Sequence, residues 1–110
     1  MKNNIVYLEH ILEAIEKIEN YLKHVDNFED FLKNDMVSDA VIRELEIIGE
    51  AATNINDEFQ KEHPDVPWKQ MIGIRNTLIH EYFGVNKKVV WETCQHDLSV
   101  LKDIVKVIVR

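Results

Sequence analysis

Apolar residues recur at spacings of three and four through most of the chain, which is the pattern of one face of an α-helix. Long stripes of this kind run through about residues 4–25, 36–61 and 87–109. Shorter apolar patterns occupy about residues 26–33 and 67–84. The pattern predicts an all-α fold, an antiparallel helical bundle of three long helices and two short ones.

Residues that start or stop helices separate the predicted elements. Asn34 is suited to cap the second long helix and Asn86 the last one, because an asparagine side chain accepts hydrogen bonds from free backbone N–H groups. Pro64 and Pro67 interrupt the helical pattern, and Gly84 is suited to follow a helix C-terminus. No repeat or linker divides the chain, so we expect residues 1–110 to form one domain.

The first and last helices carry more apolar residues than one buried stripe needs. In the first helix, the extra residues are Val6, Tyr7, Ile11 and Val25. A widened face indicates contact on two sides, and a second subunit is one candidate for the second contact.

In the second long helix, Gly49 is small, and we expect it to let a neighbouring helix approach closely.

Composition favours a folded protein and excludes several classes. Of 110 residues, 45% are hydrophobic and 30% are charged, which provides enough apolar residues for a core. The single cysteine, Cys94, cannot form an internal disulfide, so nothing requires an oxidising compartment. The N-terminus lacks the apolar core of a signal peptide, and no apolar run approaches the roughly 20 residues that span a bilayer. We therefore expect a cytoplasmic protein without a membrane segment.

The net charge of −7 is unevenly distributed. Residues 1–65 contain 6 Lys and Arg against 16 Asp and Glu, a balance of −10, and residues 66–110 contain 7 against 4, a balance of +3. A locally positive surface on an acidic body can still attract phosphates. Most of the carboxylates are best explained as solvated helix faces that keep the protein soluble.

Several chemistries find no motif in the chain. There is no glycine-rich loop for a nucleotide and no His-Glu-x-x-His pattern for zinc, so we expect no cofactor and no metal. Cys94 and His96 lie two residues apart on a predicted helix and face different ways, which makes them a poor metal pair. Glu58, Glu62 and His63 cluster at a predicted helix end, which is best explained as solvated surface. His10 and His24 lack partners at ligand spacing, and we assign none of these histidines a role.

Reactive side chains gather within residues 75–82, where Arg75, Asn76, His80 and Tyr82 fall within about two helical turns. Arginine holds phosphate through a planar fork of N–H donors, and histidine transfers protons near neutral pH. This combination suits metal-independent RNA cleavage. The histidine would take a proton from a ribose 2′-hydroxyl or donate one to the leaving oxygen, while the arginine stabilises charge on the phosphate oxygens.

Helical geometry constrains how these side chains can meet. At about 100° per residue, Arg75 and His80 lie roughly 140° apart on a regular helix. Arg75 shares a face with Tyr82, and Asn76 shares one with His80. To act on one phosphate, the helix must loosen before Gly84, the arginine must reach round it, or two subunits must contribute.

Two further groups of charged residues allow two interpretations each. Arg43 and Glu50 lie on the second long helix, where they could form solvated ion pairs or point into a cleft with residues 75–82. Lys87 and Lys88 begin the last helix, where the helix dipole favours anions. A nearby phosphate would account for these lysines, and so would two mobile surface side chains.

Residues 75–82 resemble the Arg-polar-x3-His-x-Tyr signature of HEPN-domain ribonucleases. The whole chain resembles the HepT-like toxins of prokaryotic toxin–antitoxin pairs. Residues 43–52 are similar to that family's second-helix motif, and Pro67-Trp68, residues 72–76 and Val90-Trp91 also fit it.

The resemblance implies a HEPN-type all-α homodimer in which two copies of the motif face a shared cleft. It implies a type VII-like toxin that cleaves RNA without a metal, with Arg75 and His80 as catalytic residues and Asn76 orienting His80. It also implies a partner, a small nucleotidyltransferase antitoxin of the MntA type, which neutralises the toxin by attaching AMP to Tyr82.

Two other functions stay open on the sequence. One is a non-catalytic helical dimer that binds a nucleotidyltransferase partner or a nucleotide through residues 75–82. The other is a purely structural dimerising bundle. RNA cleavage that survives a chelator and disappears when His80 is replaced would separate the ribonuclease from both.

Overall fold

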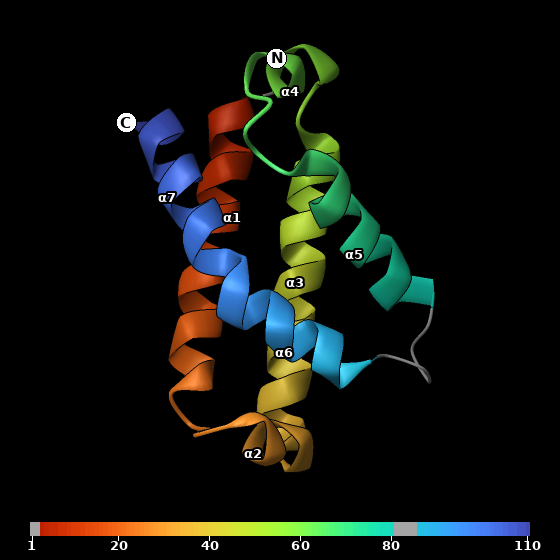
Figure 1. Cartoon of the computed structure of the whole chain (residues 1–110). Helices are drawn as coiled ribbons and strands as arrows, with labels where there is room; N and C mark the ends of the chain where they lie inside the picture. The colour runs from red at the N-terminus through yellow and green to blue at the C-terminus, as the bar shows by residue number, and fades with distance from the viewer. Residues whose placement is uncertain (1–2, 81–85) are drawn as a thin grey trace.

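The computed structural model describes residues 3–80 and 86–110, and for Leu78, Ile79 and His80 it describes the backbone alone. Seven α-helices and no strand occupy this part of the chain, which confirms the predicted all-α fold (Figure 1). The helices are α1 (Asn4–Leu22), α2 (Phe28–Lys33), α3 (Asp35–Asn54), α4 (Asp57–Glu62), α5 (Trp68–His80), α6 (Lys87–His96) and α7 (Leu98–Val109). Among the described residues, no helix is long and apolar enough to cross a membrane.

The core lies where α1 packs against α3 and α7. Helices α1 and α3 run side by side in opposite directions, and α3 lies between α1 and α5 (Figure 1). The side chains at the centre are fully or almost fully buried: Leu8, Ile11, Ile15, Ile18, Val41, Leu45, Ile48, Leu101 and Val105. They repeat at spacings of three and four, so the predicted apolar stripes are the faces that meet. Each such side chain stabilises the fold by roughly 1.5–3 kcal/mol when it is buried.

Asparagine caps five of the seven helices in the described residues. Its side chain accepts a backbone N–H at the start of α1, α2, α3, α4 and α6, through Asn3, Asn27, Asn34, Asn56 and Asn86. Such a cap typically stabilises a helix by about 1 kcal/mol relative to alanine. The predicted caps at Asn34 and Asn86 are therefore confirmed.

The long helix predicted for residues 36–61 is divided into α3 and α4. At the break, Ile55 has an extended backbone with φ −81° and ψ 132°, and its side chain is buried. The Asn56 side chain accepts the Phe59 N–H at 2.8 Å, which starts α4. The helix stops because capping at Asn56 offers the backbone an alternative partner and burial of Ile55 favours the turn.

The long helix predicted for residues 87–109 is broken at Asp97, between α6 and α7. The two halves face different neighbours, because α6 packs on α2 and α7 packs on α1. On α6, the Trp91 ring centroid lies 5.3 Å from that of Phe31 and 6.2 Å from that of Phe28. The break lets each half bury its own apolar stripe, which one straight helix could not do.

Helix α5 approaches α3 closely at Gly49. A Cβ atom at residue 49 would lie 2.8 Å from the backbone oxygen of Met71 and 2.9 Å from Cγ of Arg75. A side chain at this position would collide with α5, which confirms the role predicted for Gly49. The contact sets Arg75 directly against α3. The predicted end of this helix, near Gly84, lies outside the described residues.

Candidate active site

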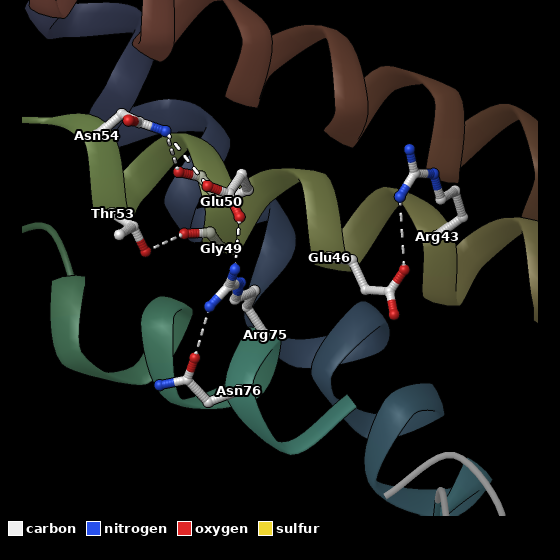
Figure 2. A network of polar contacts seen from close by, with 8 residues as sticks. All are labelled: Arg43, Glu46, Gly49, Glu50, Thr53, Asn54, Arg75 and Asn76. Carbon is white, nitrogen blue, oxygen red and sulfur yellow. Dashed lines mark hydrogen bonds and ion pairs between the residues drawn. The ribbon is translucent and has the colours of Figure 1, made fainter. Parts of the chain in front are cut away.

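Arg75 extends from α5 toward α3, and both ends of its guanidinium are held (Figure 2). Nη2 lies 2.7 Å from Glu50 Oε1, and Nη1 donates to Asn76 Oδ1 at 2.9 Å. The Arg75 side chain is 28% exposed and that of Glu50 is 53% exposed. The charge-assisted bond therefore fixes the guanidinium on α3 while solvent still reaches it.

Glu50 is held in turn by Asn54, one turn later on α3. The Asn54 amide donates to the Glu50 backbone oxygen at 2.9 Å and to Glu50 Oε2 at 3.4 Å. On the other side of the pair, Arg75 Nε is buried and has no hydrogen-bond partner within the described residues. A buried donor without a partner is unusual in folded proteins. Among the described residues, no group accepts a hydrogen bond from Arg75 Nε.

The bond between Arg75 and Asn76 bears on the predicted geometry of the motif. Neighbouring residues on a helix point about 100° apart, yet these two side chains are joined. The Arg75 guanidinium therefore contacts Asn76 on its own helix and Glu50 on α3. Which of the three arrangements brings Arg75 and His80 together stays a prediction, because the His80 side chain lies outside the described residues.

A polar cavity of about 270 Å³ lies between α1, α3 and α5, and Arg75 borders it. The residues that line it are Tyr7 and His10 from α1, Arg43, Glu46, Ile47, Glu50, Ala51 and Asn54 from α3, and Arg75 from α5. Arg43 forms an ion pair with Glu46 at 3.7 Å. Arg43 and Glu50 each make an ion pair, and each also lines the cavity that Arg75 borders. A role for them in the site stays a prediction.

The contribution of α1 to this cavity was not predicted from the sequence. His10 was expected to have no role, and Tyr7 was expected only to widen the apolar face of the helix. The spacing of three between these residues places them on one side of α1. No local signal shows that this side meets α3 and α5, because the cavity exists only after three helices pack.

A larger cavity of about 520 Å³ lies between α3, α5, α6 and α7 and shares no lining residue with the polar cavity. Apolar side chains dominate its lining, including Leu45, Ile48, Met71, Ile74 and Val90. Among the described residues that line it, Asp97 alone is charged. We therefore place the candidate chemistry in the smaller, polar cavity.

The two lysines at the start of α6 already have partners. Lys87 Nζ lies 3.0 Å from Asp35 Oδ1, and Lys88 Nζ lies 4.6 Å from the centre of the Phe28 ring. These contacts tie the start of α6 to α2 and α3. They account for both lysines, so the idea of a phosphate beside them gains no support.

Two predicted site residues cannot be placed as side chains. His80 ends α5, and only its backbone is described, while Tyr82 lies outside the described residues. The proposed orientation of His80 by Asn76 therefore stays a prediction. In the described part of the chain, no three His, Cys, Asp or Glu side chains gather into a group that could hold a metal ion.

Comparison with known proteins shows extensive similarity to one group. The family model described as ribonuclease HepT-like matches residues 11–108. A protein of Caldanaerobacter subterraneus subsp. tengcongensis named "Putative RNase TTE0752" is 46% identical over 110 residues, which cover 100% of this chain and 97% of that protein. "Probable ribonuclease HepT" of Thermococcus cleftensis is 50% identical over 96 residues, covering 87% of this chain and 86% of that protein. No solved structure matches the chain.

Proposed function

Since the chain belongs to the HepT-like ribonuclease family, we propose that it is an endoribonuclease that cleaves cellular RNA without a metal ion, using Arg75 and His80. One observation carries the proposal. The Arg75 guanidinium is held by Glu50 at a polar cavity, on the helix that ends at His80. A fixed cation near a proton-transfer residue is the minimum that this chemistry requires.

The two catalytic residues divide the reaction. The ribose 2′-oxygen attacks phosphorus and loses its proton, the bond from phosphorus to the 5′-oxygen breaks, and that oxygen gains a proton. His80 performs one of these two proton transfers. Arg75 binds the non-bridging oxygens, on which negative charge grows in the transition state. Removal of one such donor typically lowers kcat by roughly 10²–10³.

Glu50 holds the Arg75 side chain in position before RNA binds. Its carboxylate holds Nη2 of the guanidinium, and Asn54 supports it there. The guanidinium carries further N–H donors, so a phosphate oxygen can bind beside the carboxylate. Glu50 is thus a positioning residue that holds Arg75 in place while substrate binds.

The proposal includes a homodimer and a protein that switches it off. Two copies of residues 75–82 would face a shared cleft in the dimer. The partner is a small MntA-type nucleotidyltransferase, the antitoxin of a type VII-like pair that acts in the cytoplasm. It attaches AMP to Tyr82, two positions after His80, and the added phosphate would compete with RNA for Arg75.

RNA cleavage in excess EDTA tests the enzymatic part. The purified, unmodified protein is expected to degrade total cellular RNA in the chelator, and His80→Ala is expected to leave the RNA intact while retaining its helical circular dichroism. Intact RNA with the folded, unmodified wild-type protein would contradict the proposal and favour a non-catalytic dimer that binds a nucleotidyltransferase.

Mass measurement after co-expression with an MntA-type nucleotidyltransferase tests the modification. The chain is expected to gain mass in multiples of one adenylate, carried on the peptide that contains Tyr82. Tyr82→Phe is the control and should gain none. Adenylate found on another residue, or on no residue, would refute this part while leaving the RNA-cleavage result untouched.

A further inference from the structure

The α1 side of the polar cavity carries two rings that the proposed reaction does not use. Tyr7 and His10 lie three residues apart, on one face of α1. Their ring centroids are 6.1 Å apart and their planes meet at 86°, so the edge of one ring points at the face of the other. His10 is exposed and Tyr7 is half-buried, and both line the cavity that Arg75 borders.

Packing of the core does not account for His10. Its ring lies outside the buried core, so it contributes little to the folding free energy. The lining nevertheless combines flat rings on α1 with cations on α3 and α5, Arg43 and Arg75. Proteins that hold single-stranded nucleic acid use this division, in which cations follow the phosphates and rings stack on the bases.

We infer that Tyr7 and His10 form a wall that binds the base of the nucleotide whose phosphate lies on Arg75. The inference rests on the proposed function and adds its substrate class, an unpaired nucleotide of single-stranded RNA. An unpaired base can enter a cavity of about 270 Å³ between three helices, whereas a base in a duplex is covered by its neighbours. Arg43 is a second cation that lines the same cavity, and it would bind the phosphate of the neighbouring nucleotide.

Binding measurements with two anionic probes test the wall. Both are made in a His80→Ala background, so that RNA stays intact. Oligoadenylate carries phosphates and bases, whereas inorganic polyphosphate carries phosphates alone. His10→Ala is expected to weaken oligoadenylate binding roughly five- to hundredfold, the range seen when a stacking ring is removed, and to leave polyphosphate binding unchanged. Arg75→Ala is expected to weaken both.

Two variants serve as controls, one for the flat shape of the ring and one for the loss of an exposed histidine elsewhere on the surface. His10→Phe keeps a flat ring and is expected to retain oligoadenylate binding. His24→Ala removes another exposed histidine that does not line the cavity, and it is expected to change neither probe. Equal loss of both probes in His10→Ala, or failure of His10→Phe to retain binding, would overturn the base wall.

The base wall and the proposed ribonuclease activity can fail independently of each other. RNA cleavage by the wild-type protein, together with unchanged oligoadenylate binding by His10→Ala, would refute the base wall alone. Absence of cleavage would refute the enzyme. The ratio of the two probe affinities measures the wall in either case, because it does not depend on turnover.

Discussion

Helix α5 borders two cavities of opposite character. The cavity of about 520 Å³ toward α6 and α7 is the larger and is mostly apolar. The cavity of about 270 Å³ toward α1 is smaller, and its lining includes two arginines, two glutamates and a histidine. Ile74 borders the first and Arg75 borders the second, so adjacent residues of one helix serve different surroundings.

The residues that line each cavity, and not its size, decide where we place the candidate chemistry. An apolar cavity can hold a side chain or a ligand by excluding water, but the described residues that line the larger cavity include no cation to stabilise charge on a phosphate. The polar cavity holds a guanidinium that is fixed by a carboxylate at 2.7 Å and is still partly exposed. We therefore expect changes at the apolar cavity to alter stability and changes at the polar cavity to alter activity.

The largest expected effect concerns the half-buried thiol of Cys94 on α6. Burial, followed by the charge of Asp97, raises its pKa from 9.0 to about 12. At pH 8 the thiolate fraction, and with it the rate of alkylation by iodoacetamide, should be roughly a thousandfold lower than in the unfolded chain. Because the folded state favours the protonated thiol, this group also lowers stability as the pH rises from 9 toward 12.

Mass spectrometry after timed alkylation measures this effect, with the urea-unfolded protein as the reference. Equal rates for the folded and unfolded chains would show that the fold does not shield the Cys94 thiol and does not raise its pKa.

Two glycines provide a matched pair for the packing of α5. Gly49→Ala places a Cβ against Met71 and Arg75 and is expected to destabilise the protein by about 1–3 kcal/mol. Gly73→Ala meets nothing within 4 Å and is expected to stabilise α5 by about 0.5–1 kcal/mol, because glycine disfavours helix. Urea denaturation measures both. A neutral Gly49→Ala would mean that α5 can move away from α3 freely.

Glu50→Gln tests how far Glu50 positions Arg75. The neutral amide keeps the shape of the side chain but weakens the bond that fixes Arg75, so kcat for RNA cleavage is expected to fall about tenfold. KM should not rise, because a negative charge beside the RNA is lost. Glu50→Asp should recover part of the rate. An unchanged kcat in Glu50→Gln would remove Glu50 from the positioning of Arg75.

Much of the fold was predictable because its signals are local. The apolar stripes of α1 and α3 and the caps at Asn34 and Asn86 depend only on neighbouring residues. The breaks at Ile55 and Asp97 were not predicted, since the apolar spacing continues in register through both and neither contains glycine or proline. They reflect packing against other helices, which a single stripe does not reveal.

The candidate site also contains some features that have a local sequence signal and others that depend on packing between helices. Arg75 and Asn76 were singled out from their own motif, because the residue types and their spacing can be read directly from the sequence. The pairing of Arg75 with Glu50 spans 25 positions in the sequence and depends on the close contact at Gly49. The position of His10 depends on a third helix. Neither contact has a local signal that could select it among the other charged residues.

The most direct test compares Arg75→Ala with Ile74→Ala in one RNA-cleavage assay in excess EDTA. Arg75→Ala should lower the rate at least about a hundredfold with the fold intact. Ile74→Ala should lower stability by about 1–3 kcal/mol and retain most of the activity below its melting temperature. Circular dichroism confirms folding of both variants. Cleavage by folded Arg75→Ala at the wild-type rate would contradict the assignment of the polar cavity as the active site.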